Sequence, residues 1–300
     1  MTDPLADVVH LLQPNAAFSK MSEGVGAWRV RRSEEGRPFY CAVLEGSCRL
    51  SVGGHAPIVL EKDDFVLVPS AFDFMASSIA EVPADQADTV PVELGPGHYR
   101  FGKVDGPADV KMLVGYCAFG STDAHVLVSL LPDLVLARGN SRLTGLVQFV
   151  AEEFRGERPG RDVVMAHLVE VMLIEALRST TGPAAPPGLL RGLDDERLAV
   201  ALRQIHDQPA AALNVAGLAR QAGLSRSSFF ERFRRAVGVA PMEYLLHWRM
   251  ALAKDLLRGK RGGVAEVAER VGYRSASTFS VAFARHVGLP PSLYARGEAA

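Results

Sequence analysis

Two stretches decide how this chain folds: Gly223-Leu-Ser-Arg-Ser-Ser-Phe229 and, about fifty residues later, Gly272-Tyr-Arg-Ser-Ala-Ser-Thr-Phe279. In each, a serine is followed after four and eight positions by phenylalanines, and then by Val-Gly, Pro and Tyr. Self-similarity at a fixed period indicates two copies of one supersecondary unit. The repeated residues are Ser225, Phe229, Phe233, Val237, Gly238, Pro241 and Tyr244 in the first copy, and Ser275, Phe279, Phe283, Val287, Gly288, Pro291 and Tyr294 in the second.

Each copy is typical of two short helices joined by a tight turn. In the first copy we expect helices over 215–222 and 225–237, with Gly223 as the stop signal between them. In the second copy the same signals predict helices over 264–271 and 275–287. Phenylalanines four residues apart lie on one helix face. Such a helix pair is a helix-turn-helix, whose second helix enters the major groove of DNA.

A longer helix is expected between the two copies, over 244–258, where apolar residues recur with helical period. Fifteen residues of helix span about 22 Å. A rigid spacer of that scale suits two reading helices roughly one DNA turn, about 34 Å, apart.

The charge of the chain is distributed unevenly. Residues 191–300 carry 17 Lys and Arg against 10 Asp and Glu, a net charge of +7, whereas residues 1–190 carry −8. A basic module within a nearly neutral chain is the electrostatic footprint of phosphate binding. Most such cations position a protein on the DNA backbone and do not read bases. The phosphate-contact candidates are Arg232, Arg235, Arg249, Lys254, Arg274 and Arg285.

Residues from about 194 to 296 resemble the DNA-binding domain of the AraC/XylS family of bacterial transcription regulators. The resemblance rests on 223–229, on Val-Gly-Val-Ala-Pro-Met-Glu-Tyr-Leu over 237–245, and on 271–279. It implies a sequence-specific DNA-binding regulator, more often an activator that contacts RNA polymerase than a repressor. By the same resemblance, the base-reading residues are Arg226, Ser227, Phe230, Glu231 and Arg234 in the first unit, and Ala276, Ser277, Ser280 and Val281 in the second.

Two positions depart from the family pattern, which often has Arg at 231 and at 281, where this chain has Glu231 and Val281. A glutamate can accept from the cytosine amino group and a valine can touch a thymine methyl, but neither makes the bidentate guanine contact of an arginine. We therefore expect the second reading helix to position the protein more than it specifies sequence.

The chain divides into two domains with a linker between them. Residues 179–190 are dense in Pro, Gly and small residues, which marks a boundary between a domain over 1–178 and the DNA-binding domain over 191–300. Three hundred residues that are 48% hydrophobic are ample for two cores. No secretory signal is visible at the start, and the apolar run over 163–177 is too short to cross a bilayer. We expect a soluble, cytoplasmic protein.

The first domain reads as short strands that follow an initial helix over 3–12. Many short strands with turn signals favour a β-sandwich or small barrel, and this region, about 25–120, resembles the cupin-type jelly roll that often precedes such a DNA-binding domain. The expected strands are 28–31, 39–44, 48–52, 58–60, 65–68, 72–75, 98–101 and 112–119.

Metal binding is not expected in this barrel. Cupins that hold a metal would have histidines near position 40 and after Pro69, where this chain has Tyr40 and Ser-Ala-Phe-Asp-Phe. His55 and His98 are not clustered, and three cysteines without a C-x-x-C pattern argue against zinc or a disulfide framework. We therefore expect no cofactor and no catalytic residues.

The barrel is expected to form a binding pocket for a small-molecule effector, since such pockets are mostly apolar. Aromatic residues that either line the pocket or only fill the barrel are Tyr40, Phe65, Phe72, Phe74, Tyr99 and Tyr116. Cys41 and Cys48 form an alternative thiol sensor. With Glu45-Gly46 as a two-residue hairpin turn, these thiols are diagonal, roughly 7–8 Å apart by backbone, which is long for a disulfide.

Two helices are expected after the barrel, over 141–153 and 161–178. The second is apolar nearly all round, so it is buried on more than one side, and we expect it to pair two subunits as a homodimer. Two other readings stay open: a cupin-type enzyme fused to a DNA-binding domain, and an architectural DNA binder without an effector.

Overall fold

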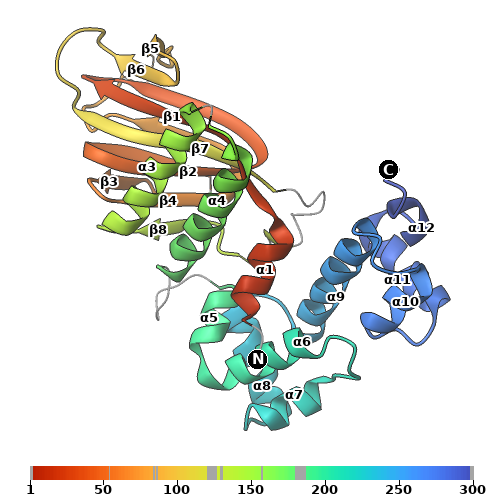
Figure 1. Cartoon of the computed structure of the whole chain (residues 1–300). Coiled ribbons are helices and arrows are strands. Elements are labelled where there is room, and N and C mark those ends of the chain that lie inside the picture. Colours follow the sequence, from red (N-terminus) through yellow and green to blue (C-terminus); the bar gives the residue numbers. More distant parts are fainter. Residues whose placement is uncertain are drawn as a thin grey trace. The chain divides into compact units, whose positions relative to one another are not determined.

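A computed structural model shows the arrangement of helices and strands (Figure 1). It divides into two units: a sheet unit over 13–120 and 132–180, and a helical unit over 1–12, 121–131 and 181–300. The residues described are 3–53, 55–83, 85, 87–119, 127–128, 131–156, 158–179 and 187–297.

The sheet unit is one curled sheet, which confirms the barrel-like, cupin-type fold class. Its described strands are β1 Pro14–Val25, β2 Arg29–Val52, β3 Ile58–Glu61, β4 Phe65–Ser77, β5 Val92–Gly95, β6 His98–Gly102, β7 Val110–Phe119 and β8 Val135–Ala137. They lie in the order β5-β6-β1-β7-β2-β4-β8, with β3 paired to β2, and only the β1–β6 pairing is parallel. Val30 and Leu50 both pair with Ala76, so the two ends of β2 flank β4 and curl the sheet.

The expected hairpin at Glu45-Gly46 is wrong. Gly46 has a left-handed φ of 72°, and a Cβ there would lie 1.8 Å from the carbonyl oxygen of Asp109. The glycine therefore lets β2 approach the start of β7 closely, and the strand continues in place of turning back. Cys41 consequently pairs with Val66 and Val114, whereas Cys48, further along the same strand, pairs with Leu60.

Two helices cover one face of the curled sheet, as Figure 1 shows. They are α3, Ser141–Arg155, and α4, Arg161–Arg178, and they match the helices expected there. The opposite face carries a buried apolar cluster that includes Trp28, Phe39 and Phe101.

The helical unit confirms the all-α expectation with two helix-turn-helix pairs. Its helices include α1 Pro4–Leu12, α5 Leu189–Asp194, α6 Glu196–Asp207, α7 Val215–Gln221, α8 Arg226–Val237, α9 Pro241–Arg258, α10 Val264–Arg270, α11 Ala276–Val287 and α12 Pro291–Tyr294. Helices α7 and α8 form the first pair, α10 and α11 form the second, and α9 contacts members of both. Because α5 begins at Leu189, and Leu189 and Leu190 are buried, the last two residues of the expected linker belong to a helix.

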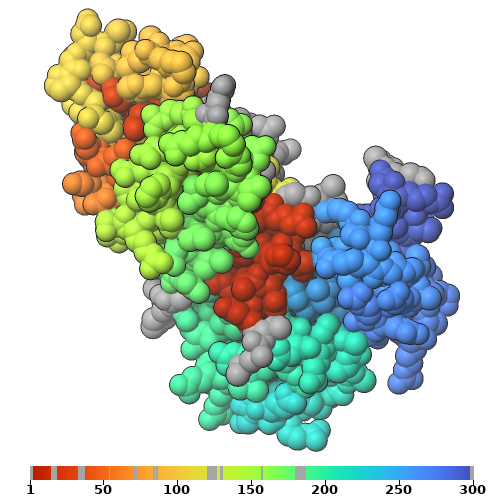
Figure 2. All heavy atoms as spheres, in the orientation of Figure 1, coloured from red at the N-terminus to blue at the C-terminus, as the bar shows by residue number. Residues whose placement is uncertain are grey.

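Helix α1 packs in the helical unit, whereas the sequence grouped it with residues 1–178. Figure 2 shows its red atoms against the teal and blue atoms of α6 and α9, which α1 contacts. The Nδ1 of His206 lies 3.1 Å from the Asp7 carboxylate and its Nε2 lies 2.8 Å from the Tyr244 hydroxyl. Since a carboxylate only accepts, the imidazole donates to Asp7 and accepts from Tyr244. The ring also stacks on Trp248 at 4.0 Å.

Candidate nucleic-acid interface and ligand cavity

The two helix-turn-helix pairs repeat the same local devices. The Ser225 hydroxyl accepts from the Ser228 amide at 3.2 Å, and the Ser275 hydroxyl accepts from the Thr278 amide at 3.2 Å. Each satisfies one of the amides that a helix start leaves without an intrahelical partner. Each reading helix then ends on a left-handed glycine, with φ of 91° at Gly238 and 85° at Gly288.

The aromatic anchors face the interior in both copies. Phe229 and Phe233 on α8, like Phe279 and Phe283 on α11, have an exposed fraction of 0%. The paired rings lie 5.6 Å apart in the first unit and 5.4 Å apart in the second. Buried anchors fix the rotation of each helix, so its opposite face is turned to solvent.

The residues expected to read bases lie on those outward faces. Four of the α8 positions are exposed, namely Arg226, Ser227, Glu231 and Arg234, and Phe230 is half-buried. A surface groove is lined by Val215, Arg226, Ser227, Phe230 and Glu231.

On α11, Ser277 and Val281 are exposed, whereas Ala276 and Ser280 are half-buried. The Ser280 hydroxyl donates to the Ala276 carbonyl at 2.7 Å, which commits its one proton to the helix backbone. A surface groove at this helix is lined by Ser277 and Val281, together with Arg285, His286 and Leu246. The sequence did not identify Arg285, His286 or Leu246 as base readers.

Three of the six phosphate-contact candidates are used within the protein. Lys254 is only 3% exposed, so it is wrong as a phosphate contact. The Arg249 guanidinium donates to the Pro209 and Ala211 carbonyls at 2.8 and 2.9 Å. Arg232 forms an ion pair with Asp195; although burial raises the pKa of Asp195, the hydrogen bond from Arg232 leaves it below its usual value. These arginines have carbonyl and carboxylate partners that the charge count does not reveal.

The other three phosphate candidates are exposed. They are Arg235, Arg274 and Arg285, which lie on α8, in the turn before α11, and on α11. Such cations are free to meet a phosphodiester backbone, which suits the positioning role expected of them.

The inner face of the curled sheet encloses a cavity with a volume of about 50 Å³. Phe74 and Tyr116 line it, as expected. Tyr40 and Phe65 do not line the cavity, and their rings stack on each other with 6.5 Å between the centroids. Tyr40 lies between the cavity-lining residues Phe39 and Cys41 on β2, and Phe65 lies on the neighbouring strand β4. Side chains one position apart in a strand point to opposite faces, which is why this aromatic pair lies outside the cavity.

One further aromatic candidate, Tyr99, also stays outside the described lining. The Tyr99 ring lies against the Lys20 ammonium, 5.0 Å from the ring centroid, and is not among the lining residues. The Phe72 side chain lies outside the described residues.

Both candidate sensor thiols line the cavity and are buried. Burial raises the pKa of Cys48 to about 12 and raises that of Cys41 well above its ordinary value. The Cys48 sulfur contacts the Met112 sulfur at 3.5 Å. Since the thiolate is the reactive form, these surroundings keep both thiols in their unreactive form.

Four donor-bearing side chains line the cavity that the sequence did not identify: Lys20, Ser22, Trp28 and Arg32. Ser22 and Trp28 are buried, and neither the Ser22 hydroxyl nor the Trp28 indole nitrogen has a hydrogen-bond partner among the described residues. Strand alternation over residues 20–24 was the available signal, since Lys20, Ser22 and Gly24 share one face.

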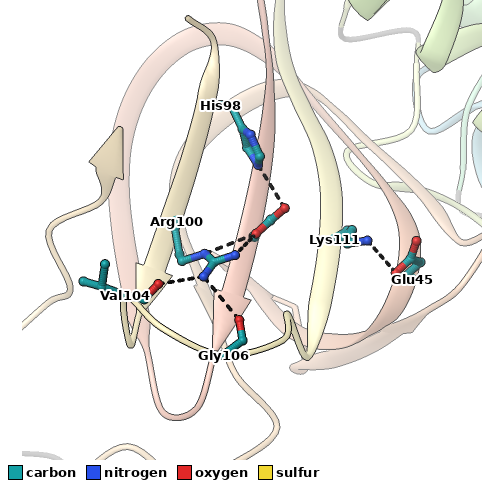
Figure 3. Close-up of polar contacts among 7 residues, drawn as sticks. Glu45, His98, Arg100, Val104, Gly106 and Lys111 are labelled. Atoms are coloured by element: carbon teal, nitrogen blue, oxygen red, sulfur yellow. Dashed lines mark hydrogen bonds and ion pairs between the residues drawn. The ribbon is translucent and has the colours of Figure 1, made fainter. Parts of the chain in front are cut away.

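A second polar cluster on β1 and β6 is already satisfied (Figure 3). Arg100 and His98 converge on the Glu23 carboxylate, at 2.6 Å and 3.0 Å. Burial raises the pKa of Glu23, but these hydrogen bonds bring it below its usual value. Arg100 also donates to the Val104 carbonyl at 2.7 Å, so the cluster fixes the edge of the sheet. His98 thus has a structural partner.

Within the described ranges, His, Cys, Asp and Glu do not gather in threes as metal ligands do. None of the helices in the described part of the chain combines the length and apolarity of a membrane span.

Comparison with known proteins identifies the relatives of both units. Residues 3–182 match the Cupin family and residues 218–297 match the Helix-turn-helix domain family. An AraC-like transcription regulator of Streptomyces lividans is 35% identical over 97% of this chain and 97% of its own length. Another, of Streptomyces antibioticus, is 33% identical over 97% and 98%.

One solved structure that this chain matches is the DNA-binding domain of AdpA, a global transcriptional factor, in complex with a target DNA. Its sequence is 32% identical to this chain, the match covers 34% of this chain and 90% of that one, and the TM-score is 0.32. The matches along the full chain, together with the two buried-anchor helix pairs, establish that this protein belongs to the AraC-like family of DNA-binding transcription regulators, with a cupin domain before its DNA-binding domain.

Proposed function

We propose that this regulator reads a promoter with both helix-turn-helix units and responds to a small molecule bound by its sheet unit. The observation that carries the DNA part is the duplicated arrangement of α8 and α11, in which buried phenylalanines oppose outward-facing reader positions. A regulator of this kind meets its operator in the cytoplasm.

The two reading helices are proposed to divide the work. Helix α8 offers a guanidinium at Arg226 and a carboxylate at Glu231, which suit guanine and the cytosine amino group. Helix α11 offers mainly the Val281 side chain, 71% exposed, and the Ser280 hydroxyl, whose proton is already used. Helix α8 therefore specifies sequence, and α11 chiefly positions the second unit.

Selection of bound DNA from a random pool tests this proposal. Arg226→Ala should cost about 1–3 kcal/mol and relax preference at one base position. Arg142→Ala is the matched control, because Arg142 is a 72% exposed arginine on α3 of the sheet unit and should leave affinity unchanged. Equal losses in both variants, or no enriched sequence, would contradict specific reading by α8.

A footprint with variants of α11 tests the division of work. Ser280→Ala and Val281→Ala should each leave base preference unchanged, since neither removes a bidentate contact. If both variants relax the preference, α11 reads sequence and the proposed division fails.

The protein is proposed to act as a homodimer paired through α4. Val164 and Val171 lie two turns apart on α4, so they share a face, and Val171 is 42% exposed. Val171→Asp should elute as a monomer at micromolar concentration. The control is Val92→Asp, because Val92 is 43% exposed on β5 and should remain dimeric. A wild-type monomer would exclude the pairing.

The sheet unit is proposed to bind an effector and not to catalyse a reaction. A metabolite melting screen tests it, because an effector at 100 times its Kd stabilises the folded state by about 2.7 kcal/mol. No stabilising compound would favour the architectural reading, whereas a bound metal with turnover would favour a cupin-type enzyme. Activation is proposed to proceed through RNA polymerase, and transcription in vitro with and without effector gives the sign of regulation.

A further inference from the structure

The cavity of the sheet unit has apolar walls and few groups that could accept a hydrogen bond. Phe39, Leu50, Phe101 and Met112 are among its apolar side chains, and none of the described lining residues is an aspartate, glutamate, asparagine or glutamine. Those four residue types carry the carbonyl and carboxylate oxygens of protein side chains. The lining therefore suits a ligand that brings no donor of its own.

Two donors on the lining are buried without an acceptor. Ser22 is 0% exposed and Trp28 is 1% exposed. Within the part of the chain that the structure describes, neither the Ser22 hydroxyl nor the Trp28 indole nitrogen has a hydrogen-bond partner. A buried donor without an acceptor destabilises the folded protein. Two such groups in one cavity wall therefore point to an acceptor supplied from outside the chain.

The two cations on the lining, in contrast, already have contacts within the protein. The Lys20 ammonium lies 5.0 Å from the centroid of the Tyr99 ring, and the Arg32 guanidinium donates to the Arg31 carbonyl at 3.0 Å. The two buried donors that lack a partner are both neutral, and moving a charged ligand into an apolar cavity is costly. An uncharged ligand satisfies these donors without that cost.

Strand β1 places both donors on the same wall. Ser22 pairs with Met112 on β7, and Gly24, the next residue on the same face, pairs with Phe101 on β6. The Trp28 indole lies over Gly24, where a Cβ would come within 2.2 Å of Nε1, so glycine leaves room for the ring. Trp28 also stacks on Phe101 at 5.5 Å, which fixes its N–H. Because residues two apart in a strand are separated by about 7 Å, the hydroxyl and the indole N–H occupy neighbouring positions of one wall.

Building on the proposed effector role, we propose that the cavity binds a small uncharged molecule whose carbonyl oxygen accepts from the Trp28 N–H and the Ser22 O–H. A carbonyl oxygen has two lone pairs and no proton, so it satisfies both donors and requires no acceptor from the walls. A water in the same place would also accept both bonds, but its own protons would face apolar side chains.

The size of the cavity limits the rest of the ligand. Its volume is about 50 Å³, whereas one water needs roughly 10–15 Å³. The space beyond the carbonyl oxygen is lined by apolar side chains such as Phe39 and Leu50, so an apolar body fills it. The ligand is therefore a short or compact ketone, ester or lactone.

NMR of the indole N–H groups in the full chain tests the proposal, with ketones and their methylene isosteres as probes. The pairs are butanone and 2-methyl-1-butene, cyclopentanone and methylenecyclopentane, and cyclohexanone and methylenecyclohexane, in which a CH₂ group replaces the carbonyl oxygen. The chain has two tryptophans, so Trp28→Phe identifies which of the two indole signals belongs to Trp28. At least one ketone should move that signal downfield and bind at least tenfold more tightly than its isostere.

Ser22→Ala separates a ligand contact from a structural role. The variant should bind that ketone at least threefold more weakly. Without ligand it should melt at or above the wild-type temperature, because the hydroxyl that it removes has no partner among the described residues. Ser19→Ala is the matched control, since Ser19 is a 2% exposed serine on the same strand that does not line the cavity. It should leave ketone binding unchanged.

Three results would overturn the carbonyl assignment: ketones that bind no better than their isosteres, an unmoved Trp28 signal, or equal losses in Ser22→Ala and Ser19→Ala. Tighter binding of cyclopentanecarboxylate than of cyclopentanone would overturn the uncharged class. If the metabolite melting screen still finds a stabilising compound, only this ligand class fails; if no compound stabilises the sheet unit, the proposed effector role fails with it.

Discussion

Replacing Phe279 by alanine should destabilise the helical unit at its second helix-turn-helix. The side chain is 0% exposed, and its ring packs on Tyr273 at 5.5 Å and on Phe283 at 5.4 Å. A buried Phe→Ala change removes this burial and leaves a cavity, at about 3–5 kcal/mol. Since whole domains are stable by only about 5–15 kcal/mol, the loss is a large share of what holds this unit together.

Urea unfolding followed by tryptophan fluorescence measures the change. The chain has two tryptophans, one in each unit, so a Trp28→Phe background leaves Trp248 as the reporter on α9. Trp248 is buried and stacks on His206, so its emission follows the helical unit. With m of about 1–3 kcal/mol/M, the midpoint of Phe279→Ala should fall by at least about 1 M.

Val281→Ala is the internal control for this experiment. It lies on the same helix but is 71% exposed, and exposed substitutions change stability by about 0.5 kcal/mol or less. Operator binding by Phe279→Ala should lose the protection of one half of the footprint. Equal midpoints for the two variants would refute the claim that Phe279 anchors α11.

Three further outcomes are expected. Burial lowers the pKa of His206, so the imidazole takes up a proton at a higher pH in the unfolded chain than in the folded one. The free energy of unfolding therefore falls as the pH drops below about 6.5. Urea melts at about pH 7 and about pH 5 should show a smaller fall for His206→Gln than for the wild type. Arg285→Ala should reduce the salt slope of DNA binding by about 0.9 per lost phosphate contact, whereas Lys254→Ala should lower the thermal midpoint and leave that slope unchanged. Because burial raises their pKa values, Cys41 and Cys48 should react with iodoacetamide only after urea unfolds the sheet; prompt labelling of the native protein would restore the thiol-sensor reading.

The helical repeat was predictable because its signals are local. A capping serine, a phenylalanine pair and a left-handed glycine fall within about a dozen residues of each other, as from Ser225 to Gly238. Local geometry alone then fixes which side is buried, so the outward position of Arg226 followed from the sequence. Helix bounds differ by only a few residues from those expected.

The sheet was less predictable because its partners are distant in sequence. Strand β1 was missed since Lys20, Ser22 and Glu23 are polar, and Glu23 finds Arg100 only 77 residues later. Similarly, Glu45-Gly46 looks like a hairpin turn, but Gly46 passes close to Asp109. These contacts are tertiary, and strand alternation alone does not reveal them.

The same limit applies to the charges and to the first helix. A net charge of +7 over 191–300 does not tell which cations are used internally, and Arg249 is committed to two carbonyls. Chain proximity assigned α1 to the first domain, but Asp7 meets His206, 199 residues away.

That reassignment concerns a short stretch of the chain in which an element of one unit directly follows an element of the other. Helix α1 ends at Leu12 and β1 begins at Pro14. Gln13 is therefore the one residue between β1, which carries Lys20 and Ser22, and α1, whose Asp7 bonds to His206. Strand β1 therefore bears cavity-lining side chains and α1 bears the carboxylate bonded to a buried imidazole, with one residue of chain between the two elements.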